Sequence, residues 1–135
     1  MLDLILIQHL NSGVNLIEYH EENSPLNTNH SSIFSGFLSA IQAMSNELEI
    51  GKIVLISTEG VNAHHCIIVS IHPISIIIIV DKSDSIESWR EIGNNIANAF
   101  FKLYGKDFDP HEISEFTDFR FIMKEICDIH KESLY

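Results

Sequence analysis

The sequence is poor in basic residues. Eight Lys and Arg stand against 19 Asp and Glu, which gives a formal net charge of -11. Proteins bind nucleic-acid phosphates through clustered Lys and Arg, and they bind anionic membrane surfaces through polybasic segments. The shortage of basic residues therefore predicts that neither a nucleic acid nor a membrane surface is the main partner.

Long apolar runs are also missing. The longest unbroken run, Ile76–Val80, is far shorter than the roughly 20 residues with which a helix crosses a bilayer. At the start of the sequence no basic segment precedes the apolar stretch and Asp3 interrupts it, so a strand is predicted there rather than a secretion signal. We expect a cytoplasmic protein without stable membrane insertion.

Cysteine is scarce as well. Cys66 and Cys127 are the two cysteines, and both stand in apolar stretches, where a free cysteine behaves as a small hydrophobic residue. By strand alternation His64, Cys66 and His72 share one face, but a structural zinc site takes four ligands and no second ligand pair accompanies them. The sequence thus predicts two buried thiols and no metal site.

Motifs for catalysis and nucleotide binding are absent. The sequence has no glycine-rich phosphate-binding loop of the P-loop or dinucleotide-binding type. It also shows no pattern that unites a nucleophile, a base and an orienting group. We therefore predict that the protein is not an enzyme, has no catalytic residues, binds no cofactor and does not itself bind nucleotide.

The residues that are present predict one α+β domain. The chain has 135 residues, 45% of them hydrophobic and 20% charged, which suits a globular domain with a sizeable core. Its periodicities predict the order β-β-α-β-β-β-α-α over a single domain, 1–135. The predicted strands are 2–9, 14–21, 52–58, 64–72 and 74–80, and the predicted helices are 32–49, 85–104 and 108–131.

The strand patterns predict how the sheet is built. The first and fifth strands are apolar on both faces, which favours the centre of a sheet that is covered on both sides. The second and third strands carry more polar residues and fit its edges. Short connections make the third, fourth and fifth strands an antiparallel meander. We expect a five-stranded antiparallel sheet with the first helix on one face and the last two on the other.

Each predicted helix has an apolar stripe at helical spacing, which we expect to face the sheet. Asp84 is predicted to cap the second helix, and Asp109 followed by Pro110 is predicted to begin the third. The stripes are Ile33, Phe37, Ile41, Met44 and Leu48, widened by Phe34 and Leu38, in the first helix, Ile86, Trp89, Gly93, Ile96, Phe100 and Leu103 in the second, and Ile113, Phe116, Phe119, Ile122 or Met123, Ile126 and Ile129 in the third.

This order of elements resembles that of longin domains, which fall with roadblock domains in the profilin-like group. Residues 33–48 resemble the first helix of stand-alone longin-like domains from archaea rich in small GTPases. Residues 4–17 resemble the opening hairpin of those domains, and residues 76–104 resemble their closing strand and helix. The likeness covers about 2–105, and the last predicted helix has no distinctive motif.

The resemblance implies a binding module rather than an enzyme. Longin and roadblock domains dock small GTPases, coat or tether subunits, or each other, often as homodimers or heterodimers. It therefore implies a protein-binding adaptor with a role like that of vesicle-trafficking components and a small GTPase as the leading partner. Coat and fusion-protein longins have a coiled coil, a membrane anchor or an attached GTPase, which this sequence lacks, so no specific trafficking complex is implied.

Small residues in the first predicted helix suggest where such a module could associate. Gly36, Ala40 and Ala43 are spaced i, i+4, i+7, which fits either close packing on the domain's own sheet or a helix-to-helix dimer contact. The strand beginning at Lys52 is a predicted sheet edge with one charge and no Pro or Gly inside. The candidate interface residues are Gly36, Ala40, Ala43, Ile53, Val54 and Leu55.

Two alternatives stay open at this point. The strand edge and first helix could form a two-fold dimer, or a different protein could add a strand to that edge. The second function class is a small-molecule-binding sensor of similar α+β architecture, which would need a hollow core with converging polar groups.

Overall fold

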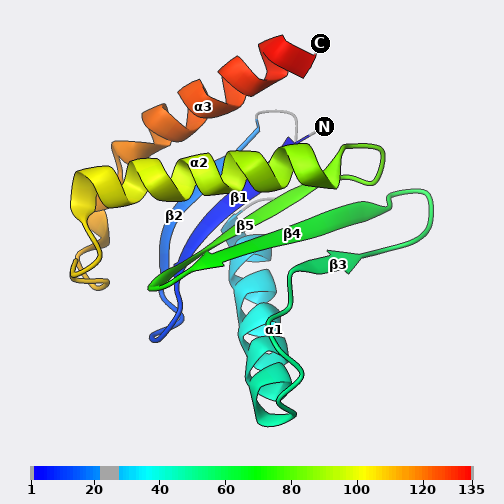
Figure 1. Ribbon diagram of the computed structural model, residues 1–135, viewed down its shortest axis with the longest axis horizontal. Coiled ribbons are helices and arrows are strands. Elements are labelled where there is room, and N and C mark those ends of the chain that lie inside the picture. Colours follow the sequence, from blue (N-terminus) through cyan, green and yellow to red (C-terminus); the bar gives the residue numbers. More distant parts are fainter. Residues whose placement is uncertain (1, 22–27, 135) are drawn as a thin grey trace.

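The computed structural model describes residues 2–21 and 28–134 (Figure 1). Over these residues the chain forms a five-stranded antiparallel sheet with three α-helices, and the predicted order β-β-α-β-β-β-α-α is confirmed. The elements are β1 (Leu2–His9), β2 (Asn15–His20), α1 (Thr28–Glu47), β3 (Leu55–Ser57), β4 (His64–Ile71), β5 (Ile74–Asp81), α2 (Ile86–Tyr104), the short 3-10 helix η1 (Ile113–Phe116) and α3 (Phe119–Leu134).

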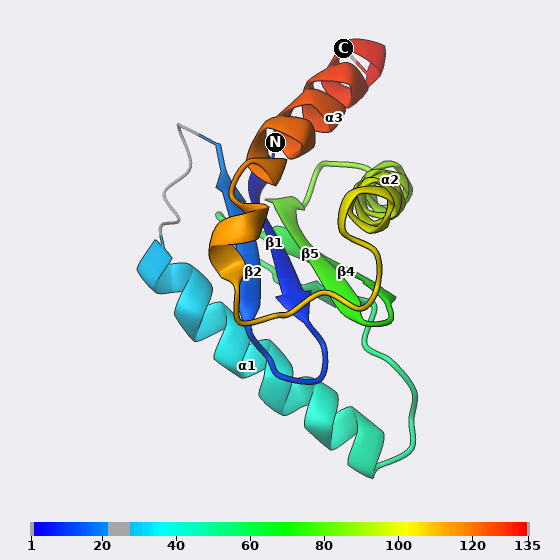
Figure 2. The same cartoon turned by 90° about the vertical axis from the view of Figure 1, so that its left-hand side faces the viewer.

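The sheet has the strand order β2-β1-β5-β4-β3. Residues 4–7 of β1 and 74–80 of β5 are buried on both faces, which places the two most apolar strands at the centre. Figure 2 shows α1 on one face of the sheet and α2 and α3 on the other. The predicted central strands, edge strands and helix layers are therefore confirmed.

Two hydrophobic cores lie on the two faces of the sheet. The α2–α3 core is the larger and joins one face of the strands to both helices, and the α1 core lies on the opposite face. Buried members of the α2–α3 core include Ile5, Ile7, Ile67, Ile76, Ile78, Trp89, Ile96, Phe100, Phe116, Phe119 and Met123. Buried members of the α1 core are Leu4, Leu6, Leu38, Cys66, Ile68, Ile77 and Ile79.

The second helix packs as predicted over most of its length. Trp89 is buried in the α2–α3 core, which confirms its predicted position. The helix is capped by Ser85, whose hydroxyl accepts from the backbone N–H of Ser88, and not by Asp84 as predicted. Leu103, predicted to continue the stripe, is exposed because Tyr104 takes that place against Phe100.

Gly93 lets α2 approach the sheet closely. A Cβ atom on this residue would lie 2.8 Å from Cγ2 of Val69 and 3.2 Å from Cδ1 of Ile78. Real Cβ atoms do not come that near to a branched side chain, so the missing side chain sets the distance between α2 and β4. The glycine in the predicted stripe thus has a packing role.

The last helix begins later than predicted. Asp109 does not cap a helix, because its carboxylate accepts from the backbone N–H of His111 at 2.9 Å and closes a turn. The chain then forms η1, buries Phe116 against Phe100, and enters α3 only at Phe119. The predicted stripe is wrong at Ile113 and Ile129, which are both exposed.

Both cysteines are free and buried, as predicted. Burial raises the pKa of the Cys66 thiol to about 12. Burial also raises the pKa of the Cys127 thiol to about 12, against an opposing effect of Lys131. Because a thiolate is the reactive form, the two side chains are inert in the folded protein.

We expect this burial to make stability fall at high pH. The folded-state pKa of each thiol lies above the ordinary value of 9.0, so its stabilising contribution is complete below pH 9.0 and is lost as the pH rises toward about 12. Urea unfolding between pH 8 and pH 11 measures the slope. A Cys66→Ala/Cys127→Ala double variant should show a shallower decline, and an equal decline would contradict the assignment.

Candidate interaction surface

The first helix turns its larger apolar side chains outward. Phe37 is 53% exposed, Met44 57% and Leu48 61%, so the predicted stripe is wrong for these three residues. The helix packs on the sheet through Leu38 and Ser45, which are 2% and 3% exposed. The side chains of Ile33 and Phe34, the other apolar residues predicted on this helix, lie outside the described part.

Polar contacts, not only apolar ones, fix the inner side of α1. The hydroxyl of Ser45 donates to the carbonyl of Gly51, and Nε2 of Gln42 donates to the carbonyl of Ile53 at 3.5 Å. These bonds hold the connection between α1 and β3 along the inner side of the helix. Gly51 has a φ of 97°, a conformation that favours glycine in this connection.

The third strand is shorter than predicted. It spans Leu55–Ser57 instead of 52–58, and it is the edge strand, as predicted. The carbonyl of Val54 accepts from the backbone N–H of Ile68 at 3.0 Å and from Nη2 of Arg90 at 3.0 Å. Beyond this point toward Lys52 the chain leaves the ladder and returns to the end of α1 (Figure 1).

The six candidate interface residues fall into two groups. Gly36, Ala40, Ala43, Val54 and Leu55 are exposed, whereas Ile53 is half-buried against the α1 core. A Cβ atom on Gly36 would meet no other atom within 4 Å. The small residues of the helix therefore do not pack on the domain's own sheet.

The exposed small and large residues of α1 form one continuous stripe. With about 100° of rotation per residue, Gly36, Ala40 and Ala43 lie next to Phe37 and Met44 on the side opposite the buried contacts. Two residues of the connection to β3, Ile50 and Val54, are also apolar and exposed. We call the following residues the α1–β3 face: Gly36, Phe37, Ala40, Ala43, Met44, Leu48, Ile50, Val54 and Leu55.

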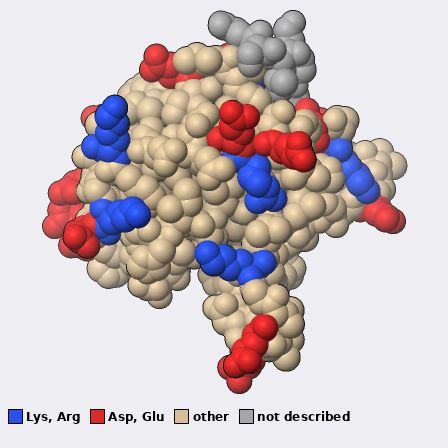
Figure 3. All heavy atoms as spheres, in the orientation of Figure 1, with Lys and Arg blue, Asp and Glu red and all other residues tan. Residues whose placement is uncertain are grey.

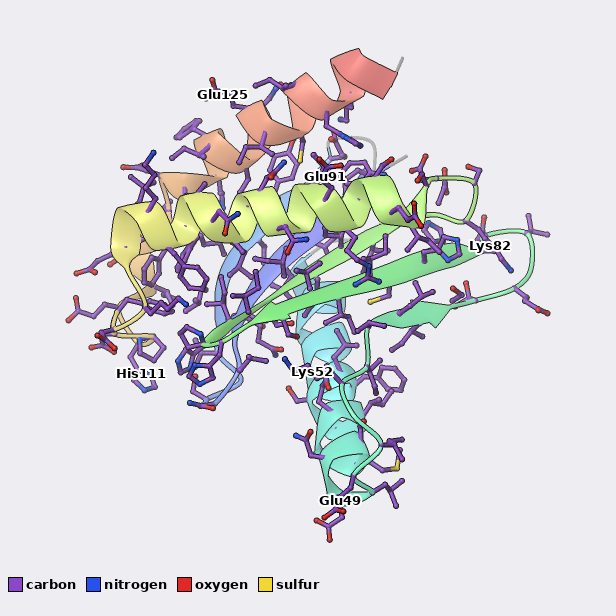
Figure 4. All side chains as sticks on the ribbon, viewed as in Figure 1. Glu49, Lys52, Lys82, Glu91, His111 and Glu125 are labelled. Carbon is purple, nitrogen blue, oxygen red and sulfur yellow. The ribbon has the colours of Figure 1, made fainter. Side chains whose placement is uncertain are left out.

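The α1–β3 face carries little charge. Between 36 and 58 the only charged residues are Glu47, Glu49 and Lys52. In Figure 3 the part of the molecule formed by α1 and the connection after it is largely without charge, with an acidic group at its tip. Figure 4 labels Glu49 at that tip and Lys52 where the connection returns to the sheet. The charge of the protein thus lies mostly on other surfaces.

Two further surface features lie away from this face. A groove of about 430 Å³ runs between α2 and α3, lined by residues that include Glu91, Asn95 and His130. Phe121 of α3 is 73% exposed and borders a second groove of about 390 Å³ beside β2. Both grooves are open to solvent on the outer surface rather than enclosed between the sheet and its helices.

Comparison with solved structures identifies the fold. No protein-family model and no curated protein matches the sequence. Among solved structures the chain is similar to MglB of Myxococcus xanthus, with a TM-score of 0.53 and 14% identity, over 75% of this chain and 85% of that one. The chain therefore has a roadblock/longin-type fold, as the sequence resemblance predicted. No helix in the described residues is long and apolar enough to cross a membrane.

Proposed function

We propose that the protein is a non-enzymatic, protein-binding adaptor that forms a dimer through the α1–β3 face and docks a small GTPase. The observation that carries the proposal is the outward orientation of Phe37, Met44 and Leu48 on the first helix of a roadblock/longin-type fold. Each of these side chains exposes more than half of its area.

The composition of the α1–β3 face supports a protein partner. Aromatic and Met side chains are enriched in the centre of protein interfaces, and charged residues are depleted there. A contiguous exposed apolar patch is uncommon on monomeric proteins and marks an interaction site. Phe37 and Met44 supply the large side chains, and the carboxylate of Glu47 is the one charge near them on the helix.

A second copy of the chain fits this face better than most partners. Two chains with a formal net charge of -11 each repel one another wherever their acidic surfaces meet. The α1–β3 face is nearly uncharged, so it is where two copies can approach with little repulsion. Gly36, Ala40 and Ala43 leave room for the helix backbones to come close, and a two-fold axis would set each patch against its own copy.

The GTPase part of the proposal rests on the fold. Domains of the roadblock and longin type dock small GTPases, and the sequence offers no phosphate-binding loop of its own, so nucleotide would be held by the partner. A dimer built through α1 and β3 would present a surface made by two subunits. We place the GTPase contact on that composite surface and keep the prediction that the chain alone hydrolyses no GTP.

Affinity capture with matched baits tests this function. The baits are the full chain, Met44→Asp in the α1–β3 face, and Phe121→Asp, which places the same charge on an equally exposed apolar residue outside it. Each is incubated with lysate from the source cells loaded with GDP or with a non-hydrolysable GTP analogue. We expect mass spectrometry to find a small GTPase on the wild-type and Phe121→Asp baits and at least tenfold less on Met44→Asp.

Reconstitution with the purified GTPase then separates binding from co-purification. A complex formed by the two purified proteins supports the proposal, and lack of GTP hydrolysis by the adaptor alone supports its non-enzymatic part. Capture that contains no small GTPase in either nucleotide state contradicts the GTPase assignment. Capture of a GTPase equally by all three baits contradicts the placement on a surface that depends on α1.

A further inference from the structure

Three side chains with metal-binding atoms meet at one end of the sheet. Asp3 comes from the start of β1, His64 from the start of β4 and Asp81 from the end of β5, and their ligand atoms lie within 4.8 Å of one another. Nε2 of His64 is 2.7 Å from Oδ2 of Asp3 and 3.6 Å from Oδ1 of Asp81. None of the three belongs to the α1–β3 face, so this cluster is independent of the proposed function.

A β-bulge delivers Asp3 to the cluster. Leu2 is opposite Val80 and Leu4 is opposite Ile79, which makes Asp3 an extra residue in β1. In a regular strand Leu2 and Leu4 would share a face, but Leu2 packs in the α2–α3 core and Leu4 in the α1 core. The bulge therefore reverses the alternation at Asp3. Such bulges commonly re-aim a side chain at a functional site.

The other two residues reach the same place by ordinary alternation. His64 is on the face of Cys66, and Asp81 is on the face of Ile79, and both of these neighbours belong to the α1 core. His64 and Asp81 are also direct partners in the β4–β5 ladder. The side chain of Asp3, from the bulge in β1, thus lies close to the side chains of His64 and Asp81, which come from regular positions of β4 and β5.

The ring of His64 is held in the orientation that a metal ligand needs. Its Nδ1 lies 2.5 Å from the carbonyl oxygen of Asn62. A carbonyl oxygen only accepts, so Nδ1 carries the hydrogen and donates it. A histidine whose second nitrogen donates to a carbonyl is the usual arrangement around protein-bound metals, because it fixes the tautomer and directs Nε2 at the ion.

Either a proton or a metal ion is needed between Nε2 of His64 and the carboxylate of Asp3. In the neutral ring the lone pair of Nε2 would face an oxygen of Asp3 at 2.7 Å, so two acceptors would point at each other. The side chain of Asp3 is only 11% exposed, and a carboxylate removed from water is costly without a compensating partner. A proton carried by the ring or by the carboxyl group satisfies this contact, and so does a metal ion.

We propose that Asp3, His64 and Asp81 bind one divalent transition-metal ion, for which Zn²⁺ is the probe. One imidazole nitrogen and two carboxylate oxygens are a donor set that Zn²⁺ accepts, with water as the fourth ligand. Bonds of about 2.0 Å place tetrahedral ligand atoms roughly 3.3 Å apart. The 3.6 Å separation already fits, and the 2.7 Å separation opens on binding.

The ion would join three neighbouring strands of the sheet, of which β1 is far in sequence from β4 and β5. It would link the start of β1 to the end of β5 and the start of β4, where Figure 4 labels Lys82. Strand alternation groups His64 with Cys66 and His72, and Asp3 and Asp81 lie on other strands. No metal site was therefore predicted from the sequence. Cys66 lies two residues further along the strand and is buried in the α1 core.

Zinc binding to the untagged full chain tests the site. The protein is freed of metal with a chelator, desalted, and titrated with Zn²⁺ by calorimetry, with inductively coupled plasma analysis of the stoichiometry. We expect one ion per chain and a melting temperature that rises with zinc. Asp81→Asn and His64→Gln should each weaken binding at least tenfold. The side chain of Asp81 is half-exposed, so Asp81→Asn disturbs the fold less than a substitution of the buried Asp3 would.

Two controls separate this site from other histidines and from thiols. His111 lies at the end of the molecule opposite Lys82 (Figure 4). The His111→Ala variant should therefore bind zinc like the wild type. Substitution with Co²⁺ should give visible bands of nitrogen and oxygen ligation without a thiolate charge-transfer band. No binding by the wild type would overturn the proposal, and so would a thiolate band or loss of zinc binding in His111→Ala.

Discussion

Replacing Trp89 by alanine is expected to lower the free energy of unfolding by about 3–5 kcal/mol, the usual range for a buried aromatic residue. Trp89 is 2% exposed and lies between α2 and the sheet in the α2–α3 core. Its indole also meets the ring of His130 from α3 edge-on, with centroids 5.0 Å apart. The substitution therefore leaves a cavity where α2, α3 and the sheet meet, and it removes a contact between the two helices.

Urea unfolding followed by circular dichroism measures this loss. A domain of this size has a stability of about 5–15 kcal/mol, so the midpoint should fall by a large fraction of its value with little change in the m-value. Leu103→Ala is the matched control, because Leu103 is a large apolar residue of the same helix that is 55% exposed. Its effect should stay within about 0.5 kcal/mol. Equal midpoints for Trp89→Ala and Leu103→Ala would show that the indole does not support the core.

The sheet topology could be predicted because the strands differ sharply in their two faces. β1 and β5 are apolar on both faces and therefore had to lie inside a sheet covered by helices on both sides. β2 ends in polar residues and the segment before β3 begins with Lys52, which left them for the edges. A strand that is buried on both faces has apolar residues at most of its positions. This pattern is visible in the sequence of the strand itself, so the inference needed no knowledge of long-range contacts.

The orientation of α1 could not be predicted in the same way. Its apolar residues spread over more than one side, and periodicity shows a stripe without showing what covers it. Phe37 and Met44 were predicted to face the core and are exposed, whereas the helix packs through Leu38, which was predicted at the side of the stripe, and through Ser45, which was not predicted there. The hydroxyl of Ser45 donates to the carbonyl of Gly51, a tertiary contact that periodicity does not reveal. The candidate surface therefore became visible only with tertiary contacts.

The cluster of Asp3, His64 and Asp81 could not be predicted from the sequence for a related reason. Alternation places Asp3 on the face opposite to Leu4, and only the bulge at Asp3 brings its carboxylate to the α1 side. A bulge changes the count of residues in one strand relative to its neighbour, so it is a property of the pairing and not of the strand alone. The same holds for β3, which begins at Leu55 and not at Lys52, because the length of an edge strand depends on its pairing with β4 as well as on its own residues.

The wild-type protein is expected to sediment as a dimer at micromolar concentration, and Met44→Asp is expected to sediment as a monomer. Met44 is 57% exposed near the middle of the α1–β3 face. In a two-fold dimer each substitution occurs twice, so two carboxylates would lose water without gaining a partner. Each unsatisfied charged group costs about 1–3 kcal/mol or more. Two of them cost about 2–6 kcal/mol and weaken the dimer roughly 30-fold to 20,000-fold.

Three variants make this result specific to the α1–β3 face. Phe121→Asp adds the same charge at an apolar residue of α3 that is 73% exposed, and it should leave the dimer intact. Val54→Lys tests whether the edge near β3 takes part, and it should weaken the dimer as well. Ala40→Trp fills the space that the small residues leave between two helix backbones and should split the dimer without adding charge. A wild-type monomer at micromolar concentration would rule out self-association, and the same face would then be left to a different protein, by strand addition at β3 or by contact with α1.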